Sequence, residues 1–206
     1  VSWSGNTTSG ATVGHGLGVA PDVIIFKRRD GTSDWHTYHS SISNGNTYLA
    51  YLNTTAVPAS SGAFLNSTYP SSSVITLGSS AGTNGSSMIA YCFANTDGYL
   101  KVGSYTGNGS SDGPFVYTGF RPAFWLMKSA SDATHWVIYD SARETFNAVQ
   151  DQLLANEANA EAASGRPVDF LSNGVKIRFS SYLNDSGQTY IYLAFAENPF
   201  KFANAR

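Results

Sequence analysis

The chain has 206 residues, a formal net charge of −2 at pH 7 and 13% charged residues. A nucleic-acid-binding surface needs a face rich in Lys and Arg to neutralise phosphates, so this low charge argues against a nucleic-acid partner. The apolar runs are too short to cross a bilayer, so we expect no membrane insertion.

The polar composition and the start of the chain indicate its setting. Abundant Ser, Thr, Asn, Gly and Tyr are typical of extracellular or virion all-β proteins, and they suit surfaces that hydrogen-bond neutral sugars. The sequence begins at Val1, with no initiator methionine and no signal peptide. We therefore expect a processed product or a part of a longer polypeptide.

Strand signals dominate the first half. Val23–Lys27 is a short, β-branched apolar run that follows Pro21, and it predicts a buried strand. Residues 35–38 follow across a loop rich in turn-forming residues and predict a β-hairpin with that strand. Further strands are expected at residues 48–52, 74–78 and 87–94. Cys92 in the last of these has no cysteine to pair with, so we interpret it as a small buried hydrophobe.

The second half gives the same signals. Phe124–Lys128 and residues 136–139 predict another hairpin. Residues 175–179 follow the turn signal Asn173-Gly174 and alternate between apolar and charged side chains, which predicts a half-solvated strand. Residues 189–196 are rich in aromatic and β-branched residues and predict a closing strand. Each half is thus expected to hold six or seven strands, with no α/β alternation.

One segment gives conflicting signals. Residues 148–163 are rich in Ala, Glu, Gln and Leu, which have high helix propensity. The corresponding part of the first half, residues 49–61, contains Thr, Val and Pro and predicts a strand followed by a loop. We expect at most a short helix in 148–163 and otherwise a long surface connection.

The correspondence between the halves indicates an internal duplication. Pro21 and Pro122, Lys27 and Lys128, and Trp35 and Trp136 are pairs of identical residues, each 101 residues apart. No flexible linker separates the halves, because residues 95–104 form a turn followed by an apolar-spaced segment. We predict one all-β domain over residues 1–206: an antiparallel, lectin-like or jelly-roll-like β-sandwich of two tandem halves, approximately 1–102 and 103–206. The shared residues, such as Phe26 with Met127 and Phe93 with Phe195, are expected in a common core.

The histidines do not form a convincing catalytic or metal site. His36 and His39 lie near Asp34, but on a strand they point to opposite faces. The second half has Val137 and Asp140 at their positions. His15 lies in a glycine-rich loop that lacks the Lys-Ser/Thr and helix of a phosphate cradle, so we interpret it as part of a turn. We expect no cofactor and no metal.

The acidic residues give no catalytic pair either. Asp140 and Arg143 are close enough in sequence to form a local ion pair, with a sugar-binding acid and base as the alternative. Glycoside hydrolysis needs two carboxylates facing each other across a cleft. The candidate carboxylates are scattered, and no spacing singles out a pair: Glu144, Glu157, Glu161, Asp169, Asp185 and Glu197. We therefore expect no catalytic residues and no enzymatic activity.

Aromatic residues are the candidates for surface recognition. Trp35 and Trp136 occupy equivalent positions, which favours a packing role over a sugar platform. Exposed tyrosines stack on sugars and anchor protein interfaces. Those outside the repeated pattern are the better surface candidates: Tyr69, Tyr99, Tyr117 and Tyr182. The sequence assigns no ligand-binding residue beyond this group.

Several separated strings resemble a known family. They are residues 103–109 (GSYTGNG), 119–124 (GFRPAF), 136–143 (WVIYDSAR), 169–176 (DFLSNGVK) and 190–200 (YIYLAFAENPF). In this order they are similar to virion-associated domains of tailed bacteriophages, many of them marine, which stand at the C-terminal end of tail-fibre or structural proteins. The resemblance covers essentially the whole chain. It implies a lectin-like sandwich at the particle surface, but no site residue is carried over with it.

Three functions remain open at this point. The first is a non-enzymatic virion module, for example a tail-fibre domain, that contacts a host-surface glycan or protein. The second is a purely architectural module for capsid decoration or fibre oligomerisation. The third is a polysaccharide-degrading enzyme on the same sandwich. The expected partners are other virion proteins and, by analogy with phage fibres, two further copies of the chain in a homotrimer.

Overall fold

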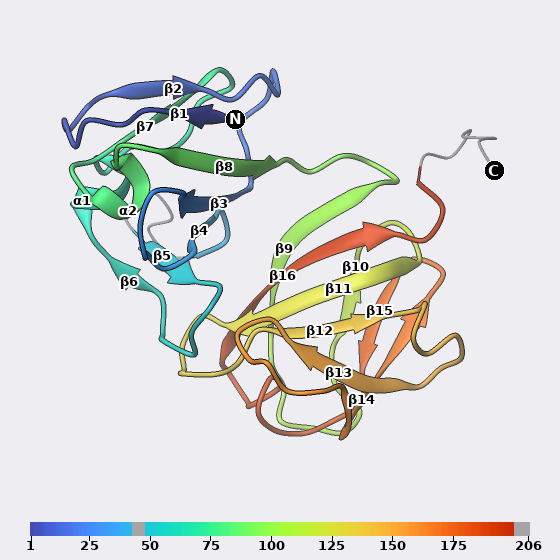
Figure 1. Cartoon of the computed structure of the whole chain (residues 1–206). Coiled ribbons are helices and arrows are strands. Elements are labelled where there is room, and N and C mark those ends of the chain that lie inside the picture. Colours follow the sequence, from blue (N-terminus) through green and yellow to red (C-terminus); the bar gives the residue numbers. More distant parts are fainter. Residues whose placement is uncertain (43–47, 200–206) are drawn as a thin grey trace. The chain divides into compact units, whose positions relative to one another are not determined.

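A computed structural model describes residues 1–42 and 48–199 and divides the chain into two compact units (Figure 1). Unit 1 spans Val1–Ala94 and unit 2 spans Asn95–Arg206. All strand pairs in the described residues are antiparallel, which confirms the prediction of an all-β antiparallel sandwich. A single domain over residues 1–206 remains a prediction. No helix in the described part of the chain is long and apolar enough to span a membrane.

Unit 1 contains a six-stranded sheet and a separate strand pair. The six-stranded sheet has the order β1-β8-β3-β4-β5-β6, and β2 pairs with β7. The strands are β1 (Ser2–Trp3), β2 (Thr12–Gly14), β3 (Val23–Arg28), β4 (His36–His39), β5 (Tyr48–Tyr51), β6 (Ala59–Ser60), β7 (Val74–Thr76) and β8 (Met88–Phe93). The predicted hairpin is confirmed, because β3 and β4 pair with Ile24 opposite Tyr38. Its side chains join the unit 1 core with Phe26, Leu49 and Ile75.

Two single-turn helices in unit 1 had no sequence prediction. They are α1 (Gly62–Leu65) and α2 (Ala81–Asn84), and each begins after a serine. The Ser61 and Ser80 hydroxyls accept the backbone N–H groups of Ala63 and Gly82, both at 3.2 Å. These are ordinary N-cap hydrogen bonds, which satisfy donors that have no partner within the helix. Helices this short have no apolar periodicity, so hydrophobic patterning cannot detect them.

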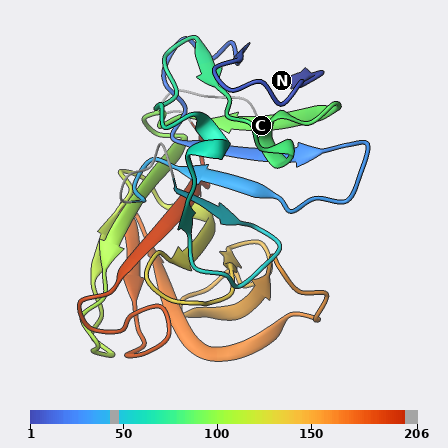
Figure 2. The same cartoon turned by 90° about the vertical axis from the view of Figure 1, so that its left-hand side faces the viewer.

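Unit 2 is built on one eight-stranded sheet with the order β10-β15-β14-β13-β12-β11-β16-β9. The strands are β9 (Leu100–Thr106), β10 (Phe115–Tyr117), β11 (Pro122–Ser129), β12 (Val137–Asp140), β13 (Val149–Leu154), β14 (Ala162–Leu171), β15 (Gly174–Ile177) and β16 (Thr189–Ala196). The predicted hairpin of β11 with β12 and the predicted closing strand β16 are confirmed. Each of the eight strands contributes to one buried cluster, so the sheet curves back around its own core (Figures 1 and 2).

Aromatic side chains dominate that core. The Trp125 and Tyr192 rings stack with their centroids 4.3 Å apart, and the Tyr105 and Tyr190 rings stack at 5.1 Å. Gly103 makes the first stack possible, because a Cβ at this position would lie 2.7 Å from the Tyr192 hydroxyl oxygen. Large aromatic surfaces removed from water supply the main driving force for folding this unit.

The strand orders of the two units correspond position by position. From β9, unit 2 runs β9-β16-β11-β12-β13-β14-β15-β10, and from β1, unit 1 runs β1-β8-β3-β4-β5-β6. The β7–β2 pair is the counterpart of β15–β10 in chain order, but it forms a separate sheet, and no ladder joins β6 to β7 in the described residues. The described residues of each unit thus form eight strands, rather than the six or seven expected. The residues expected in a common core divide between two clusters, with Phe26 in unit 1 and Met127 in unit 2. Phe93 and Phe195 are only half-buried.

The prediction for residues 148–163, at most a short helix and otherwise a long surface connection, is wrong, because the segment enters two strands of the sheet. Val149–Leu154 forms strand β13, and the chain then turns and enters β14. Val149 is buried in the unit 2 core, and Leu153 and Leu154 lie opposite Ile138 and Val137 on β12. Pairing on both sides of β13 therefore overrides the local helix propensity.

Candidate ligand-binding site

A tight turn before β9 forms the first wall of a hollow in unit 2. Leu100 N–H donates to the Thr96 carbonyl at 2.9 Å, and Tyr99 N–H donates to the same oxygen at 3.0 Å. Gly98 has a φ of 71°, a left-handed conformation that glycine adopts without steric cost. The Asn95 side chain fixes the base of the turn by accepting Val102 N–H at 2.7 Å. The Asp97 side chain is exposed at the tip.

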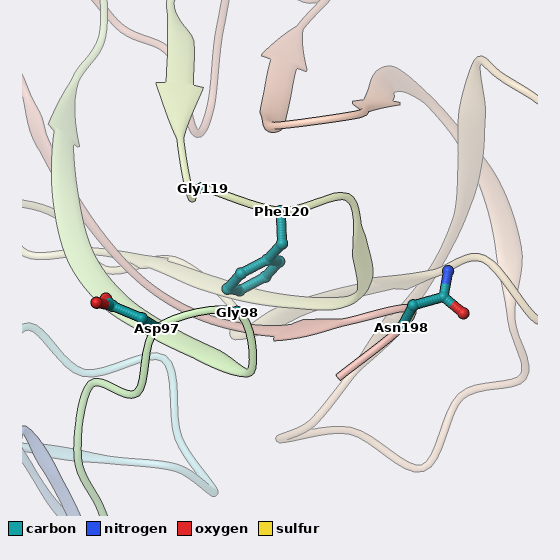
Figure 3. Close-up of a pocket in the computed structure, with 5 residues that line it drawn as sticks. All are labelled: Asp97, Gly98, Gly119, Phe120 and Asn198. Carbon is teal, nitrogen blue, oxygen red and sulfur yellow. The ribbon is translucent and has the colours of Figure 1, made fainter. Parts of the chain in front are cut away.

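The opposite wall is the connection from β10 to β11. Thr118 N–H and Gly119 N–H both donate to the Asn173 carbonyl, at 3.0 and 3.2 Å. The Thr118 hydroxyl donates to the Phe120 carbonyl at 2.6 Å, which closes the bend from inside. Gly119 has a φ of 85°, so this turn also depends on glycine. The bend directs the Phe120 ring toward the Gly98 turn (Figure 3).

The hollow between these walls has a volume of about 490 Å³ and is lined by Asp97, Gly98, Gly119, Phe120 and Asn198 (Figure 3). An adjoining hollow of about 270 Å³ shares Asp97, Gly98 and Gly119 and adds Lys101 and Tyr117 among its lining residues. The two therefore form one continuous depression. It lies beside β9 and β10, the two edge strands of the unit 2 sheet. Its size falls within the range typical of small-molecule sites.

The depression combines aromatic surface with a few polar groups. Phe120 is only 8% exposed and packs in the unit 2 core, so the open aromatic surface belongs to Tyr117, which is 63% exposed. None of the described residues makes a hydrogen bond or ion pair with the Asp97 carboxylate, so it remains open to a ligand. The Lys101 ammonium lines the second hollow. Such a surface can stack on the apolar face of a sugar while a carboxylate accepts hydroxyl protons.

The structure does not bring the histidines together. His36 and His39 are both buried, and His36 makes edge contacts with the rings of Tyr51 and Phe64. Burial lowers the pKa of His36, which favours a neutral, packed imidazole. His15 Nε2 lies 3.0 Å from the Ser71 carbonyl, and His135 Nδ1 lies 2.8 Å from the Asn156 side-chain amide. No group of metal-ligating side chains occurs among the residues that the structure describes.

Most of the candidate carboxylates hold loops in place. The predicted local pair is confirmed: Arg143 Nε lies 2.5 Å from Asp140, and Arg143 also reaches Glu161 at 2.6 Å. Burial alone would raise the pKa of Asp140, but the hydrogen bonds from Arg143 outweigh burial and lower it. Glu144 accepts two backbone N–H groups at the start of β13. Asp169 pairs with Arg178 at 2.6 Å, and Glu197 pairs with Arg121 at 3.5 Å.

The four candidate tyrosines differ in their exposure and contacts. Tyr69, Tyr99 and Tyr117 are exposed, and Tyr117 lines the depression. Tyr182 is half-buried: the Arg166 guanidinium lies 4.4 Å from its ring centroid, and its hydroxyl accepts His135 N–H at 2.9 Å. Trp35 and Trp136 share one contact, because Lys27 and Lys128 lie over their rings at 5.3 and 5.8 Å, although Trp136 is buried and Trp35 is half-buried. This agrees with a packing role for the tryptophans.

Sequence reasoning missed Asp97 and Phe120. A usable signal existed for Phe120, because residues 119–122 align without a gap with residues 18–21. Gly18 and Gly119 share a positive φ, but Val19 stands where unit 2 has Phe120. An aromatic residue present in only one half was therefore visible. Asp97 gave no signal, because an aspartate before glycine is common in turns.

The fold and this depression define an all-β protein with a small surface site on its second unit. The chain belongs to the family described as a domain of unknown function, DUF7483, whose model matches residues 1–199. Neither the curated proteins nor the solved structures include a match to this chain.

Proposed function

We propose that this chain is a non-enzymatic glycan-binding module of a bacteriophage particle, exposed on a tail fibre or similar structure. The depression of unit 2 is its binding site. The observation that carries the proposal is the combination of the exposed Tyr117 ring with an Asp97 carboxylate that no described residue pairs with, in one ligand-sized hollow that Phe120 also lines. The virion setting rests on the resemblance of the strings in residues 103–200 to phage domains.

The lining residues favour binding over hydrolysis. Of the described residues that line the depression, Asp97 is the only one with a carboxylate. Hydrolysis of a glycosidic bond uses a pair of carboxylates at a defined separation. A single carboxylate can accept hydroxyl protons and orient a sugar but does not supply both catalytic roles.

The Asp97→Asn and Phe120→Leu variants test the site. Saccharide binding by isothermal titration calorimetry should weaken about tenfold or more in each, because a charge-assisted hydrogen bond or an aromatic contact is lost. Asp132→Asn, on an exposed loop of unit 2, is the matched control and should bind as the wild type does. Equal affinities in all four proteins would contradict the assignment of the site.

A separate experiment tests the virion setting. An antibody against the chain should label intact phage particles in electron microscopy and reduce adsorption to host cells. Labelling without any effect on adsorption would favour the architectural alternative. Release of reducing ends from a host polysaccharide would instead favour the enzyme.

A further inference from the structure

We propose that the ligand is an extended, neutral oligosaccharide that leaves the depression along the edge strand β10 and ends over Phe115. This inference rests on the proposed function, because it assumes that the depression binds glycans. It adds a second, outer subsite, a minimum ligand length and a preference for uncharged sugars.

The aromatic surface continues from the depression onto β10. Tyr117 and Phe115 are 63% and 44% exposed, and Val116 between them is buried. The two rings therefore project from the same face of the strand. Residues two apart in a strand are separated by about 7 Å, a distance comparable with the length of one sugar ring. Successive sugars of one chain that leaves the depression can thus meet Tyr117 and then Phe115.

The Phe115 ring is held in place by a glycine on the neighbouring strand. A Cβ at Gly174 would lie 2.6 and 2.8 Å from Phe115 ring atoms, so the ring packs over the bare backbone of β15. Any larger residue at this position would displace it. Phe115 as a whole remains 44% exposed, and an immobilised aromatic ring loses little entropy when it binds. This is the arrangement expected of a stacking platform.

The backbone edge of β10 supplies hydrogen-bonding groups beside the rings. Ile177 N–H donates to the Pro114 carbonyl and Thr118 N–H donates to the Asn173 carbonyl. In an antiparallel ladder, alternate residues face the partner strand, so Phe115 and Tyr117 turn their N–H and C=O groups away from β15. β10 ends the sheet, so these groups lie at its open edge. Sugar hydroxyls can both accept from and donate to such an edge.

The charges along this path favour a neutral ligand. Lys176, opposite Phe115, is paired with Asp112 at 2.7 Å, and Arg178 is paired with Asp169 at 2.6 Å. These cations are therefore already neutralised. Among the described residues that line the depression there is one carboxylate, of Asp97, and one ammonium, of Lys101. The described residues along this path therefore carry no net positive charge that could compensate an acidic sugar.

The test is a titration series with linear neutral oligosaccharides of one to six units. Three series serve as probes: α-1,4-glucans, β-1,4-glucans and β-1,4-mannans. For at least one series, the dissociation constant should fall about tenfold between the disaccharide and the tetrasaccharide and then level off. Oligogalacturonates of equal length should bind more weakly, and a polyproline peptide, which also docks on aromatic grooves, should not bind.

Variants at position 115 test whether the Phe115 ring forms the outer subsite. Phe115→Leu keeps an apolar cover over Gly174 but removes the ring, so tetrasaccharide affinity should fall about three- to tenfold while disaccharide affinity is unchanged. Phe115→Trp should keep the increase in affinity from the disaccharide to the tetrasaccharide. Phe146→Ala is the matched control, because Phe146 is 84% exposed elsewhere in unit 2.

The outcomes separate this inference from the proposed function. The outer subsite is overturned if the wild type binds disaccharide and tetrasaccharide with equal affinity. It is also overturned if Phe115→Leu still binds the tetrasaccharide more tightly than the disaccharide by the wild-type factor. Either result leaves the glycan site in the depression intact. Preferential binding of the polyproline peptide or the oligogalacturonates overturns the neutral-glycan assignment. Failure of all three neutral series to bind contradicts the proposed function itself.

Discussion

Asn84 in unit 1 and Asn184 in unit 2 make three corresponding hydrogen bonds, and Asn184 Nδ2 makes a further one to Asn108 Oδ1 at 3.2 Å. Asn84 Oδ1 accepts Asn6 N–H at 3.2 Å, and its Nδ2 donates to the carbonyls of Thr8 and Gly78 at 3.1 and 2.9 Å. Asn184 Oδ1 accepts from the N–H of Asn108 at 3.0 Å, and its Nδ2 donates to the carbonyls of Ser110 and Phe179 at 2.8 and 2.5 Å. Both side chains are fully buried. Each asparagine holds a Gly-Asn loop against its unit.

Replacing either asparagine by alanine should destabilise its unit strongly. Each buried partner left without a hydrogen bond costs about 1–3 kcal/mol, so Asn184→Ala should lower the free energy of unfolding by about 3 kcal/mol or more. Urea denaturation measures the change, and hydrogen exchange shows which unit loses protection. Asn159→Ala, at an exposed position, is the control. A loss below about 1 kcal/mol would mean that water replaces the side chain.

Tyr105→Phe should change how stability depends on pH. The Tyr105 hydroxyl donates to the Leu183 carbonyl at 2.7 Å in the core, and burial raises its pKa well above 10. Because the unfolded tyrosine ionises near pH 10 and the folded one does not, this group's contribution to stability is present below that pH and is lost as pH rises above it.

The variant should therefore be less stable than the wild type by about 1 kcal/mol at neutral pH, and the difference should shrink above pH 10. Parallel urea titrations at pH 7 to 11 measure this. The other buried tyrosines are present in both proteins, so the difference isolates Tyr105. Tyr117→Phe, at an exposed position, should show no such trend. A difference that stays constant to pH 11 would argue against the raised pKa.

Gly18→Ala and Gly119→Ala form a matched pair. Both glycines have a positive φ, 75° and 85°, and a Cβ would meet no atom closer than 3.6 Å at either position. The cost is therefore conformational in both and should be about 1–2 kcal/mol of unfolding free energy. Gly119→Ala alone should weaken saccharide binding, because only Gly119 lines the depression. Equal binding by both variants would count against the site.

A peptide of residues 148–163 should be more helical in isolation than in the protein. Its composition favours helix, and the strand conformation of residues 149–154 depends on pairing with β12 and β14. Circular dichroism at low temperature, with and without trifluoroethanol, should show helix in the peptide. A peptide of residues 100–106, from β9, should not show it. An extended spectrum for both would mean that local propensity already favours the strand.

More of the fold than of the candidate site could be predicted from the sequence. The hairpins around Phe26 and Met127 and the closing strands followed from apolar runs with turn signals between them. The Asp140–Arg143 pair followed from proximity along the chain. Asp97 and Phe120 lie far enough apart in sequence, on two different turns, that no local pattern joins them. Tyr117 was predicted as a surface aromatic, but not the depression that it lines.

Local chemistry alone determined which segments form strands and where the chain turns, because apolar alternation, β-branched residues and glycine act over a few residues. It also showed the correspondence between Pro21 and Pro122 and between Trp35 and Trp136. Only the tertiary structure decided that residues 149–154 are a strand, that Asn84 and Asn184 are buried, and that β9 and β10 end their sheet beside one depression. These features depend on contacts between distant segments, whose energies exceed local preferences and leave no periodic trace in the sequence.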